Sequence, residues 1–325
     1  MKQRNKLTIL SILTSAVIMT SSMSMSTGDK RFISSYYDVL LDSVVDDVDF
    51  SLDNINFMPE DSYVPQGISI MSDYVLVSSY DYYKNKNSII CVYDKDGNLV
   101  NNCLLDINAH VGGIAYDSNN NLIWVTSYEG KVNAYLADDI VSKDEVEPIY
   151  KDILVGKGLA NYQYPWINTA SFVTIYDNVL YVGNFTLSSY GRVKKYKIHL
   201  DDELVMEYLG SFRIPNKVQG LSFYKKNDKQ YMLLSRSYGK EAASALQIFN
   251  YSEEIIDYTS DDVLSVSLNL SPMLEQIVCN GDETYLLFES NAKPYKFFQN
   301  KDFDSVKVID TPELVKKLEL KIDTN

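Results

Sequence analysis

The chain has 325 residues, of which 30 are basic and 44 acidic, so its formal net charge is −14. A surface this acidic repels phosphate backbones and excludes nucleic acid as a favoured partner. Hydrophobic residues make up 46% of the sequence, which is enough for a large folded core. The three cysteines are an odd number, which argues against a disulfide framework.

The chain begins with the pattern of a secretory signal peptide. Lys2, Arg4 and Lys6 precede an apolar stretch at residues 7–20, and a serine-rich segment follows. The apolar run is too short and too interrupted for a membrane anchor. Removing residues 1–26 leaves 27 basic and 44 acidic residues, a net charge of −17. The prediction is a secreted or cell-surface protein, monomeric and without an integral membrane segment after cleavage.

Residues 27–60 form a predicted N-terminal arm. Apolar residues within 34–48 recur at helical spacing, and residues 52–58 alternate between polar and apolar side chains. The alternating segment stands where the fourth strand of a repeat would stand. It could therefore supply the outer strand of the last repeat.

A five-fold repeat occupies most of the chain. Each unit opens with a small or polar residue and an alternating apolar run, followed by a polar turn and a second run. The five opening runs are at residues 64–70, 110–116, 169–175, 218–223 and 274–279. A third run places an aromatic residue at a matching position: Tyr93, Tyr135, Tyr196, Phe249 and Phe297.

Fourth runs follow in four units, at residues 98–105, 148–155, 205–212 and 263–270. Successive units begin 46 to 59 residues apart, counted for example from Val64 to His110 and from His110 to Thr169. Four short strands at this period are typical of a propeller blade. The prediction is an all-β, five-bladed β-propeller over residues 61–310. A six-bladed ring is the alternative, but it needs a further blade for which there is no opening run.

The C-terminal segment competes with the arm for ring closure. Residues 305–309 alternate, and Thr311-Pro-Glu313 then resembles a helix start with Thr311 as N-cap. A helix is predicted within residues 311–325. Which end of the chain closes the ring stays open.

Cys91 and Cys103 lie on the two arms of the hairpin around residues 94–97. In one register they could form a disulfide in a secreted protein. In the other reading they are small buried apolar side chains, like Cys279.

Propeller geometry predicts where a site lies. The connection into each first strand and the loop between second and third strands should meet at one funnel-shaped face of the central channel. Glu275, Glu289 and His110 are the candidate catalytic residues at this face. The candidate ligand-binding residues are polar or aromatic: Gln66, Tyr80, Asp81, Tyr128, Asn184, Gln219, Arg236 and Trp166. Trp166 belongs to an unusually aromatic loop at residues 156–167.

The chemistry of these residues leaves several readings open. Glu275 and Glu289 are expected on neighbouring strands, where two carboxyls would share a proton or a cation. Arg236 could pair with a glutamate or clamp a substrate carboxylate, and His110 could act as a base or as a structural group. Calcium is a candidate ligand of the channel, although the turns at 94–97 and 117–121 lack EF-hand spacing.

Known catalytic signatures are missing: the sequence has no Gly-x-Ser-x-Gly, no His-Glu-x-x-His, no Walker loop and no dinucleotide fingerprint. Several segments nevertheless resemble a group of secreted β-propeller proteins of Gram-positive bacteria: Val64-Pro-Gln-Gly-Ile, His110-Val-Gly-Gly-Ile-Ala-Tyr-Asp117, Val218-Gln-Gly-Leu, Ser235-Arg-Ser-Tyr-Gly239 and Leu287-Phe-Glu-Ser290. The resemblance covers about residues 60–298 and, more broadly, points to YVTN-like and quinoprotein-like propellers. It implies the fold and export, and no activity.

Two other families are less similar. The calcium-binding Glu-Gly-Pro opening of sugar-lactone lactonase propellers is not matched. Five-bladed arabinanases use three channel carboxylates, for which this chain offers Glu275, Glu289 and Asp81 without the local motifs.

The preferred hypothesis is a secreted propeller that binds a small molecule, glycan or peptide at the funnel face. One alternative is an extracellular hydrolase or lyase that uses the channel carboxylates, and another is a cell-surface interaction scaffold that uses the tyrosine-rich loops. The separation of the two glutamate carboxyls distinguishes a hydrolase, which needs roughly 5 to 10 Å between them.

Overall fold

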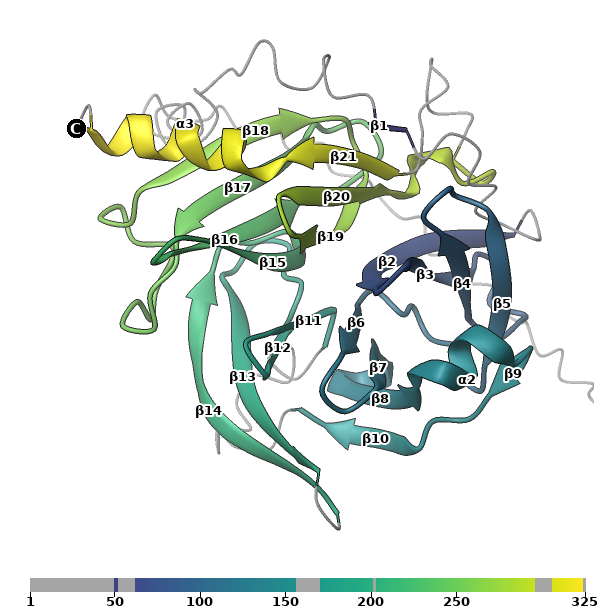
Figure 1. Ribbon diagram of the computed structural model, residues 1–325. Helices are drawn as coiled ribbons and strands as arrows, with labels where there is room; N and C mark the ends of the chain where they lie inside the picture. The colour runs from purple at the N-terminus through teal and green to yellow at the C-terminus, as the bar shows by residue number, and fades with distance from the viewer. Residues whose placement is uncertain (1–49, 52–61, 156–169, 201–202, 296–305, 324–325) are drawn as a thin grey trace, which may run out of the picture. The chain divides into compact units, whose positions relative to one another are not determined.

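Five sheets arranged in a ring make up the fold, a five-bladed β-propeller (Figure 1). The computed structural model describes residues 50–51, 62–155, 170–200, 203–295 and 306–323. The innermost strands surround a common centre, and each lies beside the innermost strand of the next sheet. The predicted fold class is therefore confirmed, with five blades rather than six.

The blades follow one another along the chain. The first contains β2 (Tyr63–Met71), β3 (Tyr74–Asp81), β4 (Ile89–Asp94) and β5 (Leu99–Leu105). The second contains β6 (Ile114–Asp117), β7 (Leu122–Thr126), β8 (Lys131–Leu136) and β10 (Tyr150–Leu154). The third contains β11 (Phe172–Tyr176), β12 (Val179–Gly183), β13 (Gly191–Leu200) and β14 (Leu204–Ile214).

The fourth blade contains β15 (Val218–Lys226), β16 (Lys229–Arg236), β17 (Ser244–Asn250) and β18 (Ser265–Leu270). The fifth contains β19 (Leu274–Asn280), β20 (Glu283–Phe288), β21 (Val306–Asp310) and β1 (Phe50–Ser51). The four predicted fourth strands correspond to β5, β10, β14 and β18.

Local sequence explains the hairpins. Asp177 and Asn178 both adopt positive φ angles, 50° and 63°, between Tyr176 and Val179, which pair directly. Such a two-residue turn matches the twist of antiparallel strands and favours Asn and Asp. Leu180 then lies opposite Tyr196, one of the matched aromatic positions. The polar turn and the alternating runs therefore set the register together.

Both ends of the described chain contribute to the fifth blade. The C-terminal strand β21 pairs with β20, and β1 pairs with the outer edge of β21, with Phe50 opposite Val308. The N-terminal segment thus supplies the outermost strand and closes the ring. The alternating segment 52–58 lies outside the described residues.

Two sequence predictions for the last blade are wrong. The third strand was predicted to contain Phe297, but the strand that pairs with β20 is β21. Ile309, opposite Thr284, therefore stands at the position that Tyr93 occupies in the first blade. Phe297 itself lies outside the described residues. The C-terminal helix α3 (Thr311–Asp323) is capped by Asp310, whose Oδ1 accepts the Glu313 N–H at 2.8 Å. Thr311 instead bonds through its hydroxyl to that of Thr284, at 2.7 Å in the core.

Helix α3 lies against β17 and β18, with Leu314 and Val315 buried among residues of the fourth and fifth blades (Figure 1). A short helix α2 (Ala137–Ser142) and strand β9 (Glu145–Val146), neither of them predicted, follow β8. Strand β9 pairs in parallel with β5 and extends the first blade to five strands. In the described ranges, no helix has the length and apolar character needed to cross a membrane.

Cys91 and Cys103 are not joined by a disulfide. Cys91 pairs with Asn102, while its neighbour Ile90 pairs with Cys103, so the two side chains point to opposite faces of the sheet. Cys91 is buried among residues of blades one and five, and Cys103 among residues of blades one and two. Both serve as small core side chains, as the second reading predicted.

A single glutamine crosses the centre of the ring. Gln276 on β19 is 1% exposed, and its Oε1 accepts the N–H groups of Ile68 at 3.1 Å and Ile114 at 2.9 Å. Its Nε2 donates to the carbonyls of Ile114 and Val173, both at 2.9 Å. Inner strands have backbone groups that no further strand can pair. Gln276 therefore satisfies groups on three other blades at once.

Close packing at the centre depends on small residues. A Cβ added at Gly220 would lie 2.7 Å from the Cα of Gln276, and one at Gly113 would lie 2.5 Å from the nitrogen of Val173. Glycine in the openings therefore permits the inner strands to approach one another.

Candidate functional site

The connections predicted to meet do lie at one end of the ring. Ser88 N–H donates to Ile107, Lys217 N–H to Thr186, and Glu289 N–H to Met273, at 2.8, 2.8 and 3.0 Å. Each bond links a loop between second and third strands to a connection that leads into an inner strand. We call this the loop end, defined by residues 82–88, 106–113, 127–130, 184–190, 215–217, 237–243, 271–273 and 289–295.

β-Bulges place the polar residues of three inner strands. The pairing shifts register at Gln66, between Pro65 and Gly67, and at Gln219, between Val218 and Gly220. It shifts again between Leu274 and Ile277, around Glu275. A bulge redirects a side chain that regular alternation would place elsewhere. Gln66, Gln219 and Glu275 converge for this reason.

Glu275 and Glu289 form a hydrogen-bonded carboxyl pair. Glu275 is 5% exposed, and Glu289 begins the short 3-10 helix η3 (Glu289–Asn291) that follows β20. The side-chain amide of Gln66 donates to Glu289 Oε2 at 2.8 Å, and that of Gln219 donates to Glu275 Oε1 at 3.4 Å. The two carboxyls are therefore close enough to share a proton, which is one of the two arrangements predicted for them.

The electrostatics of the pair assign the proton. Burial, and then the charge of Glu289, raise the pKa of Glu275 well above its usual value. Burial also raises the pKa of Glu289, but the Gln66 amide and the charge of Lys240 oppose that rise. Glu275 is thus the protonated member, which donates to Glu289.

Aromatic rings border the pair. The hydroxyls of Tyr80 and Tyr295 lie 3.2 Å apart, and burial raises the pKa of both phenols. The Lys240 ammonium lies 4.9 Å from the centre of the Tyr295 ring, a cation–π contact. The ring of Tyr82 meets Tyr295 edge-on, with centroids 5.8 Å apart. Neither Tyr295 nor Lys240 was among the predicted site residues.

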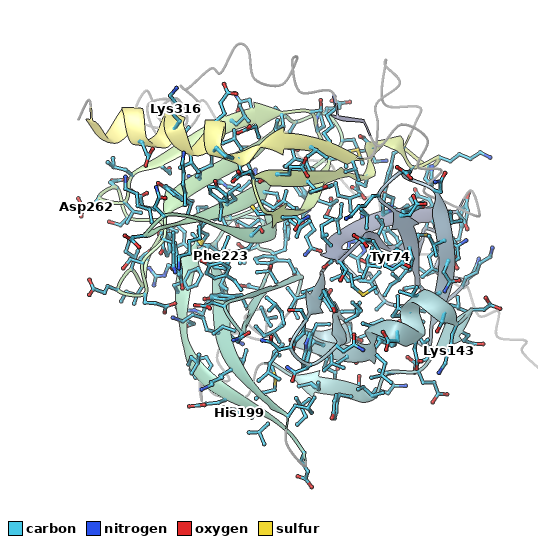
Figure 2. The ribbon with its side chains drawn as sticks, viewed as in Figure 1. Tyr74, Lys143, His199, Phe223, Asp262 and Lys316 are labelled. Atoms are coloured by element: carbon cyan, nitrogen blue, oxygen red, sulfur yellow. The ribbon has the colours of Figure 1, made fainter. Side chains whose placement is uncertain are left out.

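His110 lies beside this cluster. Its ring centroid is 4.5 Å from that of Tyr80. Desolvation and the charge of Lys84 lower the pKa of His110, but the residue is exposed, so contact with water weakens the desolvation. The neutral imidazole is therefore the form present near neutral pH. His199, by contrast, bonds to Glu207 on the outer part of the third blade (Figure 2).

Other predicted site residues shape the loops that contain them. Asp81 Oδ2 accepts the N–H of Asn85 at 2.7 Å, and Asn184 Oδ1 accepts the N–H of Arg192 at 2.8 Å. Arg236 donates to the carbonyl and the side chain of Asn216 at 3.0 and 2.9 Å, and to Gln247 at 3.3 Å. Arg236 therefore supports the connection into β15.

Tyr128, in the 3-10 turn η1 (Tyr128–Gly130), has an exposed ring at the loop end. Trp166 lies outside the described residues.

The acidic turns considered for calcium are closed by their own hydrogen bonds. Asp94 Oδ1 accepts the N–H groups of Asp96 and Asn98 at 3.0 and 2.8 Å, and bonds from Asn98 lower the pKa of Asp94. Asp117 Oδ1 accepts the N–H of Asn119 at 3.2 Å. Within the described part of the chain, no group of three or more His, Cys, Asp or Glu residues is arranged to hold a metal ion.

No family model and no curated protein matches the chain. Solved structures match it weakly. A nidogen/laminin complex shares 12% identity over 71% of this chain and 74% of that chain, with a TM-score of 0.39. A Bacteroides thetaiotaomicron protein of unknown function shares 12% over 75% and 58%, with a TM-score of 0.41. A gluconolactonase of Xanthomonas campestris shares 9% over 70% and 84%, with a TM-score of 0.38. At such low sequence identities and TM-scores, these likenesses do not indicate an activity for this chain.

Proposed function

We propose that this protein is an exported propeller that binds a small molecule, glycan or peptide at its loop end, around Glu275 and Glu289. The buried carboxyl pair is the observation that carries the proposal. Burying two carboxyls beside each other costs free energy, and a glutamine or an apolar residue would fill the same space without that cost. Ionisable groups with perturbed pKa values, gathered with amide and phenol groups, are typical of binding sites.

The same geometry argues against glycoside hydrolysis by these two residues. The carboxyls are in hydrogen-bond contact, whereas such enzymes keep them roughly 5 Å or more apart so that the sugar bond fits between them. A pair that shares a proton can instead accept hydrogen bonds through its remaining lone pairs while carrying one negative charge rather than two, which suits recognition of a hydroxyl or amide group.

A thermal-shift screen of the mature protein tests the proposal. We expect a bound sugar, oligosaccharide, peptide or small metabolite to raise the melting temperature by roughly 5 °C or more at 100 times its Kd, because ligand binding stabilises the folded state. The shift should disappear in the Glu275→Gln/Glu289→Gln double variant. Glu147→Gln, an exposed change outside the loop end, should keep it. A shift of equal size in the double variant would refute the assigned site.

The export part of the proposal rests on Lys2, Arg4, Lys6 and the apolar run that follows. We expect a host with the corresponding secretion machinery to release the protein with a new N-terminus near residue 27, because signal peptidase removes such segments. N-terminal sequencing of the protein from the culture medium checks this. Retention in the cytoplasm with Met1 intact would contradict it.

A further inference from the structure

Exposed tyrosines recur at the loop end of four blades. Tyr83, Tyr128, Tyr190 and Tyr238 are 67%, 49%, 61% and 51% exposed, and each lies in the loop between the second and third strands of its blade. Aromatic rings combine a large apolar face with a polar edge, and they contribute strongly to binding surfaces. Their recurrence in the corresponding loop of four blades makes the loop end an aromatic surface.

Positive charge gathers at the same end, although the chain as a whole is acidic. The described loops there contain five lysines: Lys84, Lys86, Lys217, Lys240 and Lys293. The acids of the same loops are exposed Glu129 and Glu241, half-buried Asp106, which pairs with Lys151, and partly exposed Glu289. The ammonium of Lys217 lies 5.8 Å from the Tyr238 ring centre, so charge and aromatic surface are joined.

The opposite end carries the acids. The segments that join third to fourth strands in blades two and four contain Asp138, Asp139, Asp144, Glu145, Glu147, Glu253, Glu254, Asp257, Asp261 and Asp262. Lys143 and Asp262 mark the outer positions of these two segments (Figure 2). This separation directs anionic partners to the loop end, even though the net charge is −14.

We infer that the loop end binds a polysaccharide that carries carboxylate groups, a polymer of uronic acids. Sugar rings would stack on the exposed tyrosines, their carboxylates would pair with Lys84 and Lys217, and their hydroxyls would bond to the partly exposed Glu289 and Gln219. This inference rests on the proposed function and names the ligand class of that site.

The arrangement favours this class over its competitors. Tyrosines on four blades suit an extended chain better than a small molecule that touches one blade. A neutral glycan would make no use of the positive charge of Lys84 and Lys217, and a peptide of glutamate residues lacks the flat apolar ring faces that stack on tyrosine. A carboxyl pair that shares a proton can bond to hydroxyls without repelling the polymer as two charges would.

The test measures binding of the mature protein to polygalacturonate by calorimetry, with dextran and polyglutamate as alternatives. We expect polygalacturonate to bind most tightly and its affinity to fall as salt increases, because salt screens the lysines. Tyr83→Ala/Tyr238→Ala and Lys84→Gln/Lys217→Gln should each weaken binding about tenfold or more. The matched controls Tyr208→Ala, on outer strand β14, and Lys225→Gln, near the end of β15, should change it less than twofold.

The outcomes distinguish the inferred ligand class from the proposed function of the loop end. Equal binding of polyglutamate, or no binding of polygalacturonate, overturns the inferred ligand class. If another ligand then gives a thermal shift that Glu275→Gln/Glu289→Gln abolishes, the proposed function still stands. Polygalacturonate binding that survives both the tyrosine and the lysine variants also overturns the inference, since the named surface would not be responsible.

Discussion

Replacing Gln276 by alanine is expected to lower the melting temperature of the propeller by roughly 10 °C. The side chain makes four hydrogen bonds to backbone groups of Ile68, Ile114 and Val173 on three other blades. Each such bond contributes about 1 kcal/mol, so the loss is about 4 kcal/mol. In a chain of this size, each kcal/mol changes the melting temperature by roughly 2–4 °C. Calorimetry of the variant measures the change.

Gln230→Ala is the matched control. This glutamine is half-buried near the start of β16, outside the centre of the ring. We expect that substitution to change the melting temperature by less than about 3 °C, in the range of ordinary surface changes. If the two variants had the same melting temperature, the hydrogen bonds of Gln276 would not be what holds the inner strands together.

Much of the fold could be predicted from the sequence because its signals are local. The turn at Asp177 and Asn178 and the alternating runs depend on residues a few positions apart, and the matched aromatics recur with the period of the repeat. Helix α2 was missed because it is only six residues long, too short for a helical period to stand out. The third strand of the last blade was predicted around Phe297 because the other blades have an aromatic residue at this position. In the structure the position is occupied by Ile309 of β21.

The candidate site, too, could be predicted from the sequence only in part. Gln66 and Gln219 could be predicted because each directly precedes the glycine of an opening, where the bulge forms. The role of Gln276 could not, since its bonds reach Ile114 and Val173, 162 and 103 residues away. Lys240 and Tyr295 were missed for a related reason: only the ring of blades brings their loops together.

Replacing Glu275 by glutamine is expected to stabilise the protein at pH 8 and to change its stability little at pH 5, because only the wild-type side chain must lose a proton as the pH rises. Burial and the neighbouring charge raise the pKa of Glu275 well above its usual 4.5, and the pKa of Glu289 rises to about 7. The folded state therefore binds protons more tightly than the unfolded chain. Unfolding releases protons, so the wild-type stability is complete below pH 4.5 and falls as the pH rises through 7.

The glutamine amide can donate the hydrogen bond that the protonated Glu275 donates to Glu289, but it never ionises. The variant should therefore lose only part of the fall between pH 5 and pH 8, since Glu289 still titrates. Urea unfolding at four pH values in this range measures the slope. Glu241→Gln, an exposed change at the loop end, should keep the wild-type slope, and an equally steep slope in Glu275→Gln would contradict the shared proton. If the same variant gains stability and loses ligand binding, the carboxyl pair lowers stability in favour of recognition, a trade-off common to binding sites.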